Sequence, residues 1–135
     1  MTNATAQTAD NAKLIAHMIE TNTAAIVKLQ DALDREANSN SLVSHSWVVV
    51  MPLLGCVKYT LTPIRENGRR RYQASDAMPA GRADTANRYT KEDAKVLAAD
   101  TVNGSGEYGR AMHWTDRAAE EIAELEKLNE TLNNL

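Results

Sequence analysis

Apolar residues near the start of the chain recur at spacings of four and three, the period of an amphipathic helix with a heptad seam. This pattern predicts a helix over residues 11–37, and the short polar side chains of residues 38–41 predict its end. Leu14, Met18 and Ala25 widen the apolar stripe, so the helix is equally suited to packing on a globular core. The seam consists of Ile15, Ile19, Asn22, Ile26, Leu29 and Leu33.

The end of the chain repeats this design. A last helix is predicted over residues 115–135, with Thr115 as its N-cap and Asp116 beside the positive end of the helix dipole. Its seam consists of Ile122, Leu125, Asn129 and Leu132. Leu128 and Leu135 broaden the apolar stripe of this helix as well.

Each seam contains one asparagine, where an apolar residue would stabilise a helix pair more. A buried Asn can fix register and helix number at that cost, so Asn22 and Asn129 predict helix pairing, either with each other in one chain or across a homodimer. The alternative is that each Asn lies at the exposed edge of a broad stripe. We expect assembly through Ile19, Asn22, Ile26, Leu29, Ile122, Leu125, Asn129 and Leu132.

Between the helices the period changes from helical to alternating. Residues 47–51 form a continuous β-branched run, which predicts a strand buried on both faces. Residues 57–65 alternate between apolar and polar, as a half-buried strand does. Asn67-Gly68 follows, and both residues tolerate the positive φ of a two-residue type I′ turn. The middle of the chain therefore contains a β-hairpin.

The turn fixes the register of this hairpin. The predicted pairs are Glu66 with Arg69, Pro63 with Tyr72, and Leu61 with Ala74. One face then carries Val57, Tyr59, Leu61, Pro63, Tyr72 and Ala74, and the other carries Lys58, Thr60, Thr62, Arg69, Arg71 and Gln73. The turn and the alternation agree independently, which supports the assignment.

The remaining segments are assigned from weaker signals. Residues 1–10 are polar and predict a leader without structure, and residues 75–88 predict a long loop. Thr90 predicts the cap of a short helix that ends near Val102 at an Asn-Gly C-cap. Residues 108–114 predict a last strand. The expected fold is α+β, with a small antiparallel sheet of three or four strands, one short helix, and long amphipathic helices at both ends.

Composition places the chain among cytoplasmic proteins. Cys56 is the only cysteine, so no disulfide can form within the chain, and the N-terminal residues lack the pattern of a signal peptide. The longest apolar stretch is far shorter than the roughly 20 residues that span a bilayer, so no membrane partner is expected.

The charge is unevenly placed along the sequence. Residues 1–43 have a net charge of −2, residues 44–114 a net charge of +3, and residues 115–135 a net charge of −4. The middle of the chain is therefore expected to form a basic β-rich core, followed by an acidic helix.

The positive charge of the middle is concentrated in arginines at the hairpin. Arginine binds carboxylate and phosphate in a bidentate way, so an acidic protein surface and a nucleic-acid backbone are both candidate targets. The overall pI of about 5.6 argues against a committed nucleic-acid binder. A charged tip that only keeps the hairpin soluble is the third alternative. The candidate partner-binding residues are Lys58, Arg65, Arg69, Arg70, Arg71, Arg82 and Arg88.

The histidines and the cysteine do not form a recognisable site in the sequence. His17, His45 and His113 lack the spacing of metal ligands, so no metal or other cofactor is expected. A small enzyme around Cys56 and His113 is the least favoured alternative, because Cys56 has the setting of a small buried hydrophobe.

These features predict a non-enzymatic interaction or regulatory module, homodimeric through its terminal helices, that binds an acidic partner through the arginine-rich hairpin. An inhibitor of a host complex, of the kind that phages and plasmids encode, is one form that such a module takes. The alternative is a nucleic-acid-binding regulator that uses the same hairpin.

Overall fold

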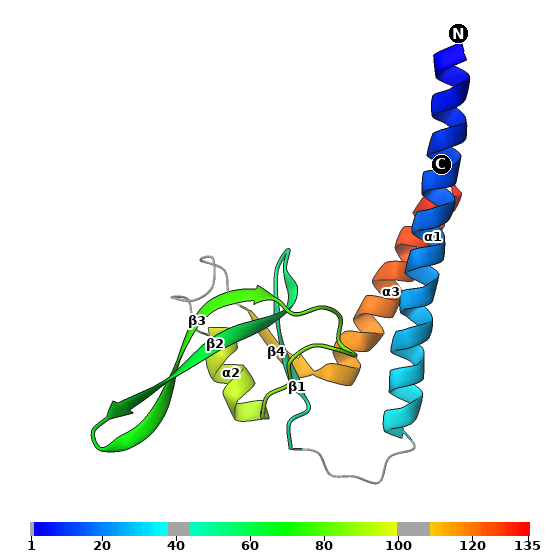
Figure 1. Cartoon of the computed structure of the whole chain (residues 1–135). Helices are drawn as coiled ribbons and strands as arrows, with labels where there is room; N and C mark the ends of the chain where they lie inside the picture. Colours follow the sequence, from blue (N-terminus) through cyan, green and yellow to red (C-terminus); the bar gives the residue numbers. More distant parts are fainter. Residues whose placement is uncertain (1, 38–43, 100–108) are drawn as a thin grey trace. The chain divides into compact units, whose positions relative to one another are not determined.

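The computed structural model describes residues 2–37, 44–99 and 109–135, and over these residues the fold is α+β as predicted (Figure 1). Three helices and a four-stranded antiparallel sheet are present in the described part. The elements are α1 (Thr2–Ala37), β1 (Trp47–Met51), β2 (Gly55–Glu66), β3 (Arg69–Pro79), α2 (Lys91–Ala99), β4 (Arg110–His113) and α3 (Trp114–Asn133).

The chain divides into two compact units. The first consists of residues 1–39 and 119–135, and so contains α1 and most of α3. The second consists of residues 40–118 and contains the sheet, α2 and the first turn of α3. Each unit has its own packing and is described by itself.

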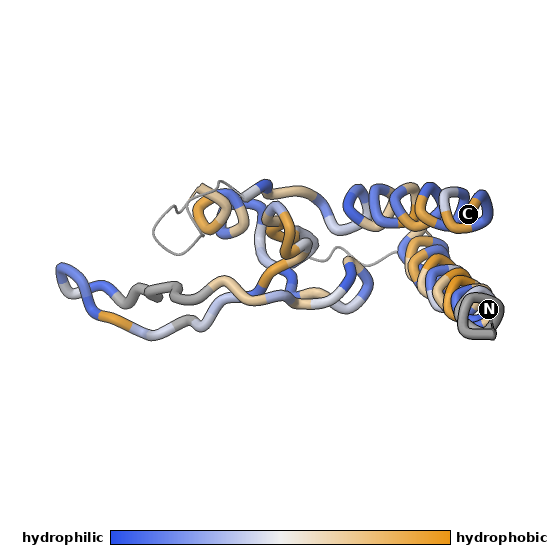
Figure 2. Tube along the Cα trace, turned by 90° about the horizontal axis from the view of Figure 1, so that it is seen from above, coloured by the Kyte–Doolittle hydropathy of each residue, from blue (hydrophilic) through white to orange (hydrophobic). Residues whose placement is uncertain are grey.

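In the first unit, α1 and α3 lie side by side and run in opposite directions (Figures 1 and 2). The residues of both seams are buried or half-buried, and Leu29, Leu125 and Leu132 are the most deeply buried. The heptad spacing therefore predicted the packing side of each helix correctly.

The start of α1 differs from the prediction. The helix begins at Thr2, whereas the polar composition of residues 1–10 predicts a leader without structure. Ala4, Ala6 and Ala9 have the highest helix propensity of any residue type, and each residue added to an existing helix gains a hydrogen bond without a new nucleation step. The helix continues to Ala37, and residues 38–43, where its end is predicted, lie outside the described residues.

In the second unit, the strands follow the order β3-β2-β1-β4 and neighbouring strands pair antiparallel. β1, β2 and β3 are joined by two consecutive hairpins. β4 follows α2 in the sequence and pairs with the edge of β1 that β2 leaves open. β1 is therefore a central strand. Its last four residues are all buried, as the continuous apolar run predicted.

One face of the sheet packs against α2. Val49, Met51 and Val57 form a core cluster with Ala94 and Ala98 of the helix. The small alanines allow the helix backbone to approach the sheet closely. The start of α2 is capped as predicted, since the amide N–H of Asp93 donates to Oγ1 of Thr90 over 3.2 Å. Its predicted end near Val102 lies outside the described residues.

The opposite face of the sheet is also buried. Val48, Val50 and Cys56 are each no more than 4% exposed. Successive residues of a strand point to opposite faces, so these side chains alternate with the cluster against α2. Residues 80–88, assigned as loop, run beside β2, where the amide of Ala80 donates to the carbonyl of Cys56. Both faces of the sheet are therefore shielded from water at β1 and at the start of β2.

The β2–β3 hairpin has the predicted register. Asn67 and Gly68 have φ values of 52° and 76°, as a type I′ turn requires. The three predicted pairs, Glu66 with Arg69, Pro63 with Tyr72 and Leu61 with Ala74, are all present. The predicted faces hold near the core, where Val57 and Tyr59 are buried and Lys58 is exposed. Pro63 is exposed, because the hairpin has left the core at that point.

The loop predicted over residues 75–88 begins too early. β3 continues to Pro79, which pairs with Val57. A register shift between Lys58 and Thr60 interrupts the ladder, because Lys58 pairs with Met78 whereas Thr60 pairs with Ser75. Such a bulge breaks the alternation along the strand and conceals it from a periodicity search.

The junction between β4 and α3 also differs from the prediction. α3 begins at Trp114, so Thr115 lies inside the helix and cannot be its N-cap. His113 is the N-cap instead, since its Nδ1 accepts the amide N–H of Thr115 over 3.3 Å. The same nitrogen lies 2.7 Å from Oγ1 of Thr115. The strand predicted over residues 108–114 is thus shortened to Arg110–His113, and Tyr108 lies outside the described residues.

Candidate partner-binding site

The β2–β3 hairpin extends well beyond the sheet. β1 pairs with β2 only at Gly55, Cys56 and Val57. From Lys58 onward β2 therefore pairs with β3 alone, and the hairpin projects as a two-stranded ribbon (Figure 1). We call residues 58–78 the ribbon. At about 3.3 Å per residue, the tip lies roughly 25 Å from the point where β2 leaves β1.

The tip of the ribbon carries the arginine cluster. The register places Arg65 directly opposite Arg70, while Glu66 faces Arg69 and Ile64 faces Arg71. The Arg65 and Arg69 side chains are exposed, one on each strand. The tip therefore presents a local excess of positive charge to solvent.

The register also distributes these arginines over the two faces of the ribbon. Residues two apart on a strand share a face, so Arg65 and Arg70 belong to one face and Arg69 and Arg71 to the other. The tip therefore carries arginines on both faces of the ribbon.

The other three candidate residues do not belong to the tip. Lys58 is exposed but pairs with Met78 at the base of the ribbon, about seven residues, or roughly 23 Å, from Arg65. The Arg88 guanidinium lies 4.1 Å from the ring centroid of Trp114, where it forms a cation–π contact within the second unit. Arg82 lies in a turn, where its backbone carbonyl accepts the amide N–H groups of residues 85 and 86. The site thus narrows to Arg65, Arg69, Arg70 and Arg71.

The predicted assembly residues lie in the contact between α1 and α3 of one chain. Nδ2 of Asn22 donates to Oδ1 of Asn129 over 3.0 Å, and Nδ2 of Asn129 donates to Oγ1 of Thr23 over 3.3 Å. Thr23 in turn donates to the carbonyl of Ile19. Of the two pairings that the sequence left open, the structure shows the one within the chain.

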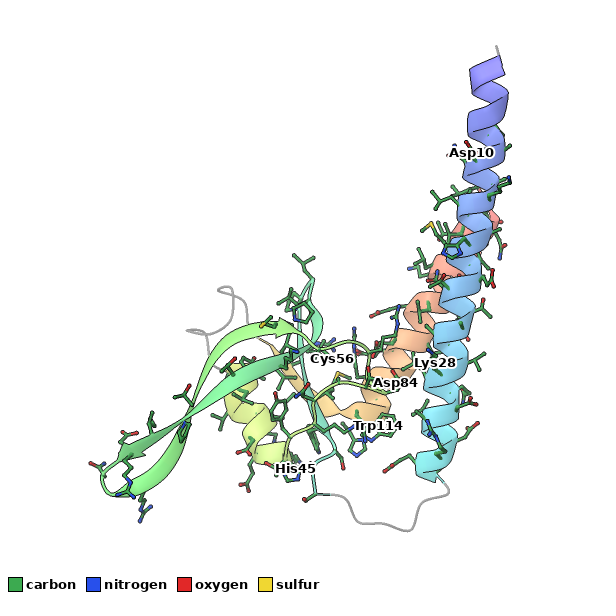
Figure 3. All side chains as sticks on the ribbon, viewed as in Figure 1. Asp10, Lys28, His45, Cys56, Asp84 and Trp114 are labelled. Atoms are coloured by element: carbon green, nitrogen blue, oxygen red, sulfur yellow. The ribbon has the colours of Figure 1, made fainter. Side chains whose placement is uncertain are left out.

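Cys56 and His113 do not come together. β2 and β4 pair with opposite edges of β1, where Cys56 faces Val50 and His113 faces Trp47. Their Cα atoms are therefore about 10 Å apart along the strands and about 10 Å apart across them. Figure 3 shows Cys56 at the far end of β1 from His45. Among the described residues, no group of three or more His, Cys, Asp or Glu side chains is placed to hold a metal ion.

The phenol of Tyr89 has a clearly shifted pKa. Burial raises the pKa of its phenol above the usual 10.0, and the backbone amide of Tyr59 offsets part of this rise. The Tyr89 backbone exchanges two hydrogen bonds with Trp47. These contacts give Tyr89 a structural role in closing the core.

The interpretation of the sequence missed the pairing of Arg65 with Arg70. Its signal was nevertheless present, because the register set by Asn67-Gly68 already implies the pair. The contact of Arg88 with Trp114 had no comparable signal, since the two residues are distant in sequence.

Within the described residues, no helix has both the length and the apolar character needed to cross a membrane. Comparison of the whole chain with models of known protein families, with curated proteins and with solved structures finds no match.

Proposed function

We propose that this chain is a non-enzymatic interaction module that binds an acidic surface of a partner protein through the tip of the β2–β3 ribbon. The observation that carries the proposal is the position of the arginines. They lie at the end of a projecting ribbon, far along the strands from the core formed by Val49, Val57 and α2. Charge in that position is available for contact outside the chain.

The number of arginines at the tip supports the same proposal, since the register places Arg65 directly opposite Arg70, next to Arg69 and Arg71. A carboxylate from a partner binds a guanidinium group in a bidentate way. Arginine is also one of the residues that most often carry the binding energy of an interface.

A nucleic-acid duplex is a second candidate, favoured by the distribution of the arginines over both ribbon faces. A two-stranded ribbon fits the major groove, and a ribbon inside a groove meets phosphates on both sides. The net charge of the chain, −3, favours the protein partner, since committed nucleic-acid binders are usually basic.

Self-association is part of the proposal, but its interface must lie outside the seam. The Asn22–Asn129 contact already uses the seam within one chain. Ribbon binding and self-association are thus assigned to different surfaces.

The test compares the wild type with two variants that each lose four positive charges. The ribbon variant carries Arg65→Gln, Arg69→Gln, Arg70→Gln and Arg71→Gln. The lysine variant carries Lys13→Gln, Lys28→Gln, Lys95→Gln and Lys127→Gln, four exposed residues that do not belong to the ribbon. Each protein is immobilised and exposed to native lysate with and without nuclease.

We expect the wild type and the lysine variant to retain the same protein after nuclease treatment, and the ribbon variant to lose it. Retention that disappears with nuclease would transfer the assignment to the nucleic-acid candidate. Equal retention by the ribbon variant and the wild type would refute a role for the arginines in either case.

A further inference from the structure

The α1–α3 pair has two unlike flanks beside its seam. On one flank the residues next to the seam are polar and exposed; they include Thr23, Gln30, Glu126 and Asn133. On the other flank they are largely apolar, and we call Leu14, Met18, Ala25, Leu128 and Leu135 the apolar flank. A two-stranded coiled coil normally has charged residues on both flanks, so this asymmetry needs an explanation.

The apolar residues of both helices lie on the same side of the pair. Met18 and Ala25 each precede a seam residue of α1 by one position, and Leu128 does the same before Asn129 in α3. In antiparallel helices this shared offset turns both sets toward one side. Leu14 borders the same stripe one turn before Met18, and Leu135 lies one heptad after Leu128.

This flank is open to solvent in the single chain. Leu14 is 57% exposed, Met18 is 38% exposed, Leu128 is 43% exposed and Leu135 is 81% exposed. The flank is continuous with the buried seam, because Leu132, between Leu128 and Leu135, is only 7% exposed. Further apolar surface can therefore pack here without any rearrangement of the seam.

The length of α1 adds a second argument for an additional partner. Asn22 lies opposite Asn129, and α3 continues only four residues further, to Asn133. At equal rise per residue, α3 ends near the level of Met18, so α1 continues to Thr2 without α3 beside it. Isolated helical segments of this length are marginal in water.

We infer that a second copy of this chain covers the apolar flank, with each α1 packed against the partner's α3 in a four-helix arrangement. One feature favours a second copy as the occupant. The α1 side of the flank has the small Ala25 where α3 has the large Leu128, so α1 and a partner's α3 are complementary in size at this level.

Sedimentation equilibrium of the full chain tests this inference. We expect the wild type to be a dimer at high concentration, and Met18→Lys and Leu128→Lys each to weaken the dimer by about tenfold or more. Val27→Lys and Val96→Lys are matched controls, because these valines are 53% and 71% exposed and lie outside the flank. The controls should leave the dissociation constant unchanged.

Cross-linking gives a second readout that does not depend on a destabilising charge. A mixture of Ala25→Cys chains and Leu128→Cys chains should form mixed disulfides faster than a mixture of Val27→Cys and Leu128→Cys chains. Cys56 is buried and contributes little background. A wild type that stays monomeric at all concentrations, or equal cross-linking in the two mixtures, would overturn the inference. The ribbon variant should still dimerise, so loss of partner binding and loss of dimerisation are distinguishable.

Discussion

Outside the hairpin turn, Leu53 is the one non-glycine residue with a positive φ in the described part of the chain. The amide of Leu54 donates to the carbonyl of Pro52 over 2.8 Å, which closes a tight γ-turn with Leu53 at its centre. Its φ is 67°, a region that a leucine rarely adopts, and its side chain is fully exposed. Because this side chain is exposed, its packing against the described residues does not compensate for the strain.

Replacing Leu53 with glycine should therefore stabilise the protein. Glycine adopts positive φ without a steric penalty, so Leu53→Gly is expected to raise the free energy of unfolding by about 1 kcal/mol. Urea unfolding followed by circular dichroism measures the change. Leu54→Gly, one residue away, lacks the positive φ and should be neutral or destabilising. A loss of stability in Leu53→Gly would contradict the assigned strain.

The raised pKa of Tyr89 predicts that the free energy of unfolding falls at alkaline pH. Its pKa is raised in the folded chain, so the unfolded chain loses the phenolic proton first as the pH rises past 10.0. The contribution of Tyr89 is fully present below that pH and is lost as the pH rises through the folded pKa. Unfolding free energies of the wild type should fall more steeply in this range than those of Tyr89→Phe. Parallel curves for the two proteins would exclude the effect.

At the scale of elements, the sequence predicted what depends on local chemistry. The positive-φ turn at Asn67-Gly68 determines which residues pair across the hairpin, and the heptad spacing determines which side of α1 and α3 is buried. Both signals are contained within a few residues. The predicted positions of the tip arginines followed from the same turn.

Other features depend on contacts that no local pattern contains. The bulge near Lys58 concealed the continuation of β3 to Pro79. His113 rather than Thr115 caps α3, because β4 leads directly into the helix. The contact of Arg88 with Trp114 removed Arg88 from the candidate site. Such assignments need the folded chain, because their partners are distant in sequence.

The Asn22–Asn129 hydrogen bond predicts a specific pattern of stability changes. Asn22→Ala leaves the half-buried amide of Asn129 without this partner, and we expect a loss of about 1 kcal/mol. The double variant Asn22→Leu with Asn129→Leu should recover that loss or exceed it, because leucines suit a seam better. A double-mutant cycle of Asn22→Ala, Asn129→Ala and the double alanine variant, followed by urea unfolding, measures the coupling. Additive losses would show that the two amides do not interact in solution.

At the scale of the whole molecule, structural and binding roles are assigned to different parts of the chain. The sheet core and the α1–α3 seam use their apolar residues internally. The ribbon tip and the apolar flank hold the charge and the apolar surface that the chain leaves exposed. A dimer through the flank would present two ribbons, which strengthens binding to a repeated or symmetric partner through avidity.

Fluorescence anisotropy with defined anionic probes tests the role of the ribbon most directly. A labelled peptide rich in Glu and Asp and a labelled DNA duplex are each titrated with the wild type, the ribbon variant and the lysine variant over a range of salt concentrations. We predict that the wild type and the lysine variant bind the acidic peptide, and that the ribbon variant binds at least about tenfold more weakly. Tighter binding to the duplex, with a salt slope that falls by about 0.9 for each lost arginine contact, would favour nucleic acid. Equal affinity of the ribbon and lysine variants for both probes would contradict the account.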